Sequence, residues 1–262
     1  MRRAIDVPAM IALVLALFGS RVASAQARDV PVVAAAADLN VALPELARLF
    51  TQQTGKSVRL VFGSSGAFTQ QILNGAPFQL FLSADEQYVQ RLVADRKTDG
   101  TGSLYATGRI GLFIPRGAAW QSDSSMRGFV AAVRSGRIGA FAIANPDHAP
   151  YGRAAKEALQ ALGVWQTLQP RLVLGENAAQ ATQFAMSGSA QGGIIPLSLA
   201  MTPHVRAAGT FVLIDARWHA PLRQRMVLLK GATSTAREFH AFLQTTAARD
   251  VFAHYGFVLP DR

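Results

Sequence analysis

The stretch Val61–Pro77 reads VFGSSGAFTQQILNGAP, and its change of pattern decides the fold. An apolar run stops at a GSSG loop (63–66), and a helical pattern begins directly after it, with Phe68, Ile72 and Leu73 on one side. The stretch therefore predicts a buried strand, a tight loop and an amphipathic helix, which together form one βα unit.

The same alternation of strand and helix continues along the chain. Expected strands cover 30–36, 58–62, 80–82, 109–114, 138–144, 171–174, 193–195 and 225–229, and expected helices cover 39–50, 68–73, 86–93, 152–162, 179–186 and 236–255, with a break near Thr245. Strands that alternate with helices of this length predict an α/β fold with mostly parallel sheets flanked by helices.

The first 25 residues have the pattern of a secretory signal peptide. A short basic start precedes the apolar run Met10–Phe18, and Ala23-Ser24-Ala25 has the small-residue form of a cleavage site. We therefore expect an exported, periplasmic protein whose mature chain starts near Gln26. A retained membrane anchor is the alternative interpretation of the same residues.

Composition excludes several kinds of protein. The chain has no cysteine, so its fold cannot depend on disulfides or thiolate-bound metal. Its formal charge is +10, and removal of residues 1–25 leaves +8. The arginines are scattered and no basic run is interleaved with aromatic residues, so we expect no nucleic-acid partner. A diffuse positive field would still attract small anions.

The GSSG loop carries the first chemical hypothesis. The first N–H groups of a helix have no partner inside the helix, and the helix dipole makes that end partly positive. A small anion bound there receives several hydrogen bonds. Gly63 and Gly66 would let the backbone approach such an anion, and Ser64 and Ser65 would add hydroxyl donors. The alternative is that one of the two serines only caps the helix.

Two enzymatic or metal-dependent alternatives centre on His148. No second histidine lies at the spacing of a metal site, so we expect no metal and no cofactor. A serine hydrolase could pair Ser65 with His148, but the G-x-S-x-G pattern is absent around Ser65. Tyr151, in the loop that follows His148, stands where a side chain or N–H group could face a ligand.

Five stretches together resemble the periplasmic molybdate-binding proteins of ABC transporters, which have the type II periplasmic binding-protein fold. The stretches cover residues 32–50, 62–85, 145–165, 175–188 and 251–260. The resemblance implies two lobes with a ligand cleft between them. It divides the chain into a signal peptide (1–25), a first lobe (26–105 plus 223–262) and a second lobe (106–222), with crossings near Arg109 and Arg223.

The resemblance also implies which residues bind the ligand. Ser65 falls on the family's serine in the second loop, whereas the first loop has Ala37 and Asp38 where the family usually has a serine. Tyr151 and Ala178 fall on positions that use backbone N–H groups or a tyrosine hydroxyl. A family tyrosine is replaced by Pro196, and Tyr151 is expected to compensate. The expected ligand-binding residues are Ala37, Asp38, Ser64, Ser65, Tyr151 and Ala178.

Asp38 is open to two interpretations. The favoured one makes it the N-cap of the helix that begins at Leu39. If its carboxylate instead faced the cleft, it would repel a dianion and could accept a proton from a phosphate-like ligand.

The resemblance implies a monomeric binding protein, not an enzyme, that captures molybdate or tungstate through hydroxyl and backbone N–H donors and delivers it to an ABC permease. Two alternatives stay open. One is a protein of the same fold that binds sulfate, phosphate or an organic anion. The other is a periplasmic serine hydrolase that uses Ser65.

Overall fold

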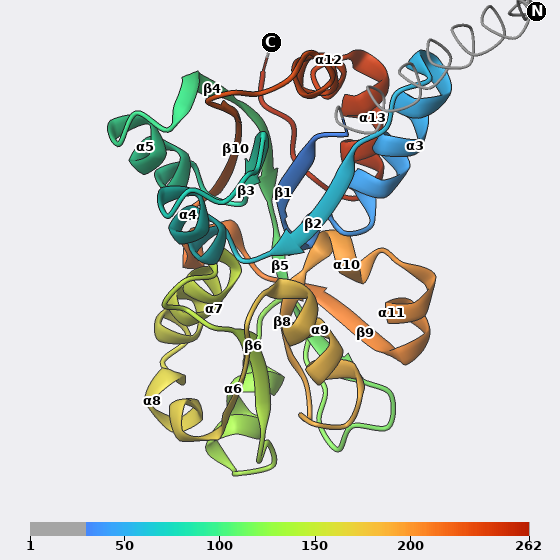
Figure 1. Ribbon diagram of the computed structural model, residues 1–262. Helices are drawn as coiled ribbons and strands as arrows, with labels where there is room; N and C mark the ends of the chain where they lie inside the picture. Colours follow the sequence, from blue (N-terminus) through green and yellow to red (C-terminus); the bar gives the residue numbers. More distant parts are fainter. Residues whose placement is uncertain (1–29, 262) are drawn as a thin grey trace, which may run out of the picture.

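The computed structural model describes residues 30–261 of the 262-residue chain, so the expected signal peptide lies outside the described residues. The described part folds into two lobes, each built on a five-stranded sheet (Figure 1). No helix within residues 30–261 is long and apolar enough to cross a membrane.

The sheet of lobe 1 has the strand order β2-β1-β3-β10-β4. Its strands are β1 (Val32–Ala36), β2 (Arg59–Gly63), β3 (Leu80–Ser83), β4 (Thr98–Gly108) and β10 (Leu222–Leu229). Its helical segments are η2 (Ala37–Leu39), α3 (Ala42–Thr54), α4 (Ser65–Leu73), α5 (Glu86–Ala94), α12 (Ser234–Phe242) and α13 (Thr246–His254).

The sheet of lobe 2 has the strand order β7-β6-β8-β5-β9. Its strands are β5 (Ile110–Pro115), β6 (Phe141–Ala144), β7 (Leu172–Gly175), β8 (Gly193–Pro196) and β9 (Gly209–Leu213). Its helical segments are α6 (Arg127–Arg134), α7 (Pro150–Ala161), α8 (Trp165–Leu168), η3 (Gln169–Arg171), α9 (Ala178–Met186), α10 (Leu197–Ala200), α11 (Pro203–Ala208) and η4 (Ala216–Trp218).

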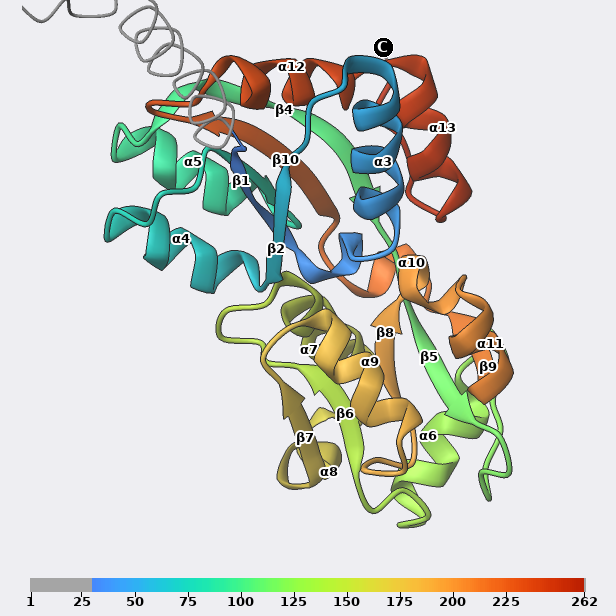
Figure 2. The ribbon, with the colours of Figure 1, turned by 45° about the vertical axis from the view of Figure 1, so that its right-hand side comes forward.

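Helices cover both faces of each sheet, which explains the unbroken apolar strands of the sequence. In β1, Val33 and Ala35 pack in the cluster formed with α3, α12 and α13, whereas Ala34 packs in the cluster formed with α4 and α5. Figure 2 shows α3 and α13 together on one side of this sheet and α4 and α5 on the other. Four of the five residues of β1 are therefore buried.

Both sheets are mixed, so the expectation of mostly parallel sheets needs correction. The strands β2, β1 and β3 are parallel, as are β7, β6 and β8. Strand β10 runs antiparallel to both of its neighbours, and so does β5. The antiparallel half of each sheet contains the strands that lie directly before and after the two crossings between the lobes.

Two chain segments cross between the lobes. Gly108 ends β4 in the first sheet and Ile110 begins β5 in the second, so only Arg109 separates them. The chain returns between Leu213, which ends β9, and Leu222, which begins β10. The Arg109 guanidinium donates to the Ile214 carbonyl at 3.5 Å and so links the two crossings. The lobe limits inferred from the sequence stay a prediction.

The observed elements differ from the expected ones at several places, and the short helices α6, α8, α10 and α11 were not expected. The segment expected to be helical from Leu39 to Phe50 begins as the short η2, and α3 starts only at Ala42. The break expected near Thr245 is confirmed, because Thr245 caps the start of α13. The strand β4 was not expected, since its sequence TDGTGSLYATG is polar and contains three glycines.

Candidate functional site

A small cavity lies between the lobes, at the carboxyl ends of strands from both sheets. Its empty volume is about 190 Å³. The residues that line it are Ala36, Ala37, Asp38, Gly63, Ser64, Ser65, Ala84, Ala149, Pro150, Tyr151 and Ala178. All six residues expected to bind the ligand are among them, although they come from four loops in two lobes. We call this cavity the interlobe pocket.

Four helical N termini converge on the interlobe pocket. Ser64 and Ser65 are the N-cap and first residue of α4, and Ala178 is the first residue of α9. Tyr151 lies in the first turn of α7, and η2 begins at Ala37. First-turn N–H groups have no partner within their own helix, and each helix dipole adds partial positive charge. The pocket lining contains no lysine, arginine or histidine.

Ser65 is fully buried, and its hydroxyl has one hydrogen-bond partner among residues 30–261. Its Oγ accepts a hydrogen bond from the Ala84 N–H at 3.0 Å. A hydroxyl that accepts one hydrogen bond keeps its proton free to donate. Ser65 therefore offers a fixed hydroxyl donor to whatever occupies the pocket.

Ser64 performs the capping role that the sequence left open. Its Oγ accepts from the Ala67 N–H at 3.3 Å and lies 2.9 Å from His148 Nδ1. The Gly66 N–H also donates to the His148 carbonyl at 2.9 Å. Both contacts with His148 join lobe 1 to lobe 2, so the start of α4 is also a contact between the lobes.

Asp38 is not a helix cap, which corrects the favoured interpretation of this residue. Val41 stands at the N-cap of α3, and Asp38 lies inside η2. The Asp38 side chain is fully buried, and its Oδ2 accepts from the Tyr151 hydroxyl at 2.9 Å and from Gln224 Nε2 at 2.7 Å. The three-residue η2 turns the side chain inward, away from the start of α3.

Burial dominates the electrostatics of Asp38. It raises the pKa of the carboxyl to about 6, against the lowering effect of the hydrogen bonds from Gln224 and Tyr151. The second carboxyl oxygen, Oδ1, is buried and has no hydrogen-bond partner in the described part of the chain. Asp38 is also the one ionisable carboxyl in the pocket lining.

Tyr151 connects the lobes through Asp38. Its hydroxyl donates to Asp38 Oδ2 and accepts from Gln224 Nε2 at 3.1 Å. Burial, followed by the Asp38 charge, raises the pKa of Tyr151 well above its usual value, so the hydroxyl stays protonated. The absence of a side chain at Gly108 leaves the space that this hydroxyl occupies.

Three residues of this polar network were not predicted. Gln224 from β10 is fully buried, and its Oε1 accepts from the Tyr105 hydroxyl of β4 at 2.7 Å. Ser198 of α10 donates to the Asp38 carbonyl at 2.8 Å. Pro196, which takes the place of the family tyrosine, caps α10 and does not line the pocket. No local sequence pattern marks Gln224, Tyr105 or Ser198, because β10, β4 and α10 come together with η2 only in the folded chain.

The geometry does not favour the metal or hydrolase alternatives. Among residues 30–261, no group of three or more His, Cys, Asp or Glu side chains could hold a metal ion. His148 contacts Ser64 and lies 3.5 Å from Glu176, while the hydroxyl of Ser65 is bonded to Ala84. His148, the base of the hydrolase alternative, therefore contacts Ser64 and not Ser65, which would be the nucleophile.

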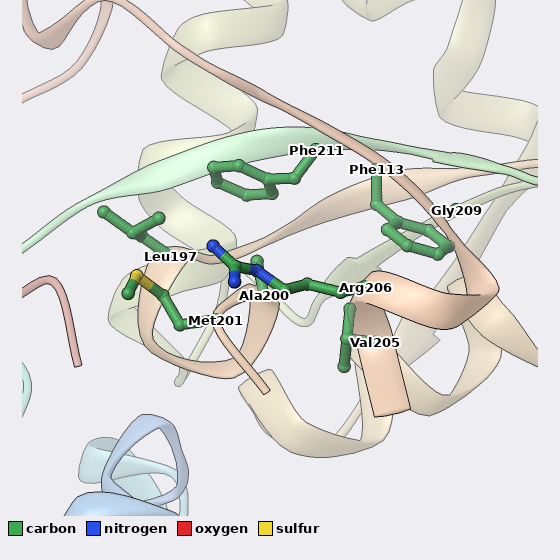
Figure 3. A pocket seen from close by; sticks show the side chains of 8 residues that line it. All are labelled: Phe113, Leu197, Ala200, Met201, Val205, Arg206, Gly209 and Phe211. Carbon is green, nitrogen blue, oxygen red and sulfur yellow. The ribbon is translucent and has the colours of Figure 1, made fainter. Parts of the chain in front are cut away.

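Three larger hollows lie outside the interlobe pocket, and one of about 680 Å³ is lined by Trp120 and the end of β5. Two more are found elsewhere in the described residues. One, of about 550 Å³, belongs to lobe 2, where apolar side chains of β5, β9, α10 and α11 surround the Arg206 guanidinium (Figure 3). The other, of about 1570 Å³, is an open groove between α3 and β2 on one side and α9 and α11 on the other. The open groove also contains the N-cap residues of α3, α9 and α11, which are Val41, Asn177 and Thr202, but it is far larger than the interlobe pocket.

Comparison with known proteins gives a consistent result. Residues 31–258 match the sequence profile of the family described as bacterial extracellular solute-binding protein. The molybdate-binding protein ModA of Rhodobacter capsulatus is 36% identical over 230 residues, which cover 87% of each chain. The ModA of Escherichia coli is 30% identical over 232 residues, which cover 87% of this chain and 88% of that protein.

Solved structures show the same likeness. The periplasmic molybdate-binding protein of Azotobacter vinelandii has a TM-score of 0.80 at 29% identity, and the match covers 88% of this chain and 100% of that one. The sulfate-binding protein SubI of Mycobacterium tuberculosis has a TM-score of 0.70 at 17% identity, covering 88% and 87% of the two chains. At that identity the second likeness concerns the fold alone.

Proposed function

The chain belongs to the family of bacterial extracellular solute-binding proteins, and we propose that it captures molybdate in the interlobe pocket and delivers it to the permease of an ABC transporter. The resemblance to molybdate-binding proteins and the two-lobed type II periplasmic binding-protein fold are confirmed. The observation that carries the proposal is the convergence of four helical N termini from two lobes on one pocket without a cationic side chain.

The pocket suits a small, fully ionised oxyanion. Backbone N–H groups of Tyr151 and Ala178 and the hydroxyl of Ser65 supply donors from three directions. Donors fixed by buried helices need no reorganisation when the ion arrives, so little ordering entropy is lost on binding. A tetrahedral dianion has four acceptor oxygens and can use donors from both lobes at once.

Discrimination among oxyanions follows from size and protonation. Sulfate is smaller than molybdate, so a pocket fitted to molybdate makes poorer contacts with sulfate, while tungstate is close to molybdate in size. Phosphate carries a proton at neutral pH, and a site of donors alone rejects that proton. The carboxylate of Asp38 is the one anionic acceptor in the lining that could accept it.

We further propose that the protein is exported to the periplasm, acts as a monomer and catalyses no reaction. The relatives are binding proteins, and the expected signal peptide agrees with this location. Closure of the lobes around the ion would then give the permease a surface that differs from that of the open protein.

A panel of ligands in a thermal-unfolding assay tests the proposed function. A ligand at 100 times its dissociation constant stabilises the folded protein by about 2.7 kcal/mol. We expect clear increases in Tm with molybdate and tungstate and little change with sulfate, phosphate or chloride at equal ionic strength. A dominant shift with phosphate or sulfate would assign the protein to another anion. Ester hydrolysis that disappears in Ser65→Ala would instead support the hydrolase alternative.

A further inference from the structure

Asp38 poses a physical problem for a pocket that binds a dianion. Its carboxyl group lines the pocket, is fully buried and has no cationic partner among the residues that line the pocket. An ionised carboxylate in this place would repel a dianion at close range in a medium of low dielectric constant.

The hydrogen bonds around Asp38 show where a proton would reside. Oδ2 already accepts from Tyr151 and Gln224, whereas Oδ1 has no partner in the described part of the chain. A protonated carboxyl has one O–H donor, and here Oδ1 is the oxygen free to carry it. A carboxylic acid held in this way presents a hydroxyl to the pocket, as a serine would.

We propose, building on the proposed function, that Asp38 binds the oxyanion as a neutral carboxylic acid whose Oδ1–H donates to a ligand oxygen, so that ligand binding takes up a proton. The proton comes from bulk solvent and stays on Asp38 while the ion is bound. Asp38 is then a specificity-determining residue. Its O–H points at a ligand oxygen, so a ligand that carries its own proton on that oxygen would set two donors against each other.

The other groups that face Asp38 do not titrate in the same range. Tyr151 of α7 contacts it directly, and Tyr105 of β4 contacts it through Gln224 of β10. Burial raises the pKa of both tyrosines well above 10. From α10, Ser198 contributes a hydroxyl that donates to the Asp38 carbonyl. Because burial raises the pKa of Asp38 to about 6, its carboxyl takes up a proton closer to neutral pH than an exposed carboxyl does.

The sign of the pH dependence follows from linkage. In the folded protein, burial raises the pKa of the Asp38 carboxyl to about 6, and a dianion placed beside it raises that pKa further. The complex therefore binds more protons than the free protein between these two pKa values, and affinity falls as pH rises. One proton taken up corresponds to about a tenfold loss of affinity per pH unit within that window.

Calorimetric titration of the full mature chain with sodium molybdate between about pH 6.5 and about pH 8.5 tests this inference. We expect the dissociation constant to rise by up to about tenfold per pH unit. Parallel titrations in buffers of different ionisation enthalpy should show uptake of close to one proton, a measurement that needs no variant. Asp38→Asn keeps a neutral donor at every pH, so its affinity should lose the pH dependence and exceed that of the parent at the alkaline end.

Two controls separate Asp38 from other causes. His148→Gln removes the nearest histidine to the pocket, and the molybdate affinity of this variant should still fall as pH rises. Asp38→Ala should lose the slope and also bind more weakly than the parent at about pH 6.5. A flat profile for the parent without proton uptake would overturn the inference while leaving the proposed function intact. No molybdate binding at any pH would overturn the proposed function itself.

Discussion

At the scale of single residues, Ser65 makes one contact that the structure shows and one that we propose. Its Oγ accepts from the Ala84 N–H at 3.0 Å, and its own proton is free for the pocket. The first contact fixes the hydroxyl in place and satisfies a backbone donor beside the ligand. The second contact depends on the ligand alone.

Removal of this hydroxyl should therefore affect both binding and stability. In Ser65→Ala we expect molybdate binding to weaken by about 1.5–3 kcal/mol, because a hydrogen bond to a charged group is lost. The unfolding free energy should fall by about 1–3 kcal/mol, since the Ala84 N–H is left buried without a partner. Calorimetric titration measures the first quantity and denaturant unfolding without ligand measures the second.

Thr69→Ala is the matched control for this prediction. Thr69 lies in the same helix and is equally buried, but its Oγ1 donates to the Ser65 carbonyl and does not line the pocket. It should lower stability and leave molybdate affinity close to that of the parent. Parental affinity in Ser65→Ala would show that the ligand does not use this hydroxyl.

Sequence reasoning reached some residues of the site and missed others for a physical reason. Ser65 lies at the start of a helix shortly after a strand, so its place could be inferred locally, whereas Ala178 was inferred from the resemblance alone. The role of Asp38 could not be inferred locally, because its partners Tyr151 and Gln224 are 113 and 186 residues away in the chain. Burial and long-range contacts decide whether a carboxyl caps a helix or faces a cavity.

At the scale of elements, the start of α4 packs directly against the loop that precedes α7. The Gly66 N–H donates to the His148 carbonyl at 2.9 Å, across the boundary between the lobes. A Cβ atom at position 66 would lie 2.6 Å from that carbonyl oxygen, closer than real Cβ contacts come. This glycine is therefore required for the close approach of the two elements.

We expect Gly66→Ala to impair closure of the lobes without weakening lobe 1. Alanine is favoured over glycine within a helix by about 0.5–1 kcal/mol, so the ligand-free protein should not lose stability when its lobes are apart. Molybdate affinity should fall by at least about tenfold, because the backbone clash raises the free energy of the closed form by more than about 1.4 kcal/mol. Titration calorimetry and ligand-free thermal unfolding measure the two effects.

Gln70→Ala provides the comparison on the same helix. Gln70 is exposed and does not line the pocket, so this change should alter neither affinity nor closure. If Gly66→Ala binds molybdate as tightly as Gln70→Ala does, contact between α4 and the His148 loop is not part of the bound form.

The elements that the sequence predicted are those with strong local patterns. The apolar strands β1 and β3 and the amphipathic α5 and α7 follow their expected ranges closely, whereas β6 covers only the second half of its expected range. Strand β4 could not be predicted from its polar sequence, because it is held by its pairing with β10. The antiparallel placement of β5 and β10 likewise depends on where the chain crosses between lobes.

At the scale of the whole molecule, several contacts hold the lobes together around the pocket. Arg153 of α7 pairs with Asp85, which also caps α5 in lobe 1. Tyr151 and Ser198 of lobe 2 bond to Asp38 of lobe 1. These contacts surround the pocket. Closure of the lobes therefore also completes the binding site.

The chain crosses between the lobes at Arg109 and again over residues 214–221. The junction at Arg109 joins two strands directly, and the return segment carries the short η4. Rotation about such segments can open the lobes without disturbing either core. The two-lobed fold could be predicted from the resemblance, whereas the contacts that close it could not.

A crystal structure of the mature protein grown with molybdate tests the central claim most directly, since the anomalous signal of molybdenum locates the ion. We predict that the ion lies in the interlobe pocket, within hydrogen-bond distance of Ser65 Oγ and of the backbone N–H groups of Tyr151 and Ala178. The Asp38 carboxyl should contact a ligand oxygen through Oδ1. An ion bound elsewhere, or one clasped by an arginine or lysine side chain, would contradict the account.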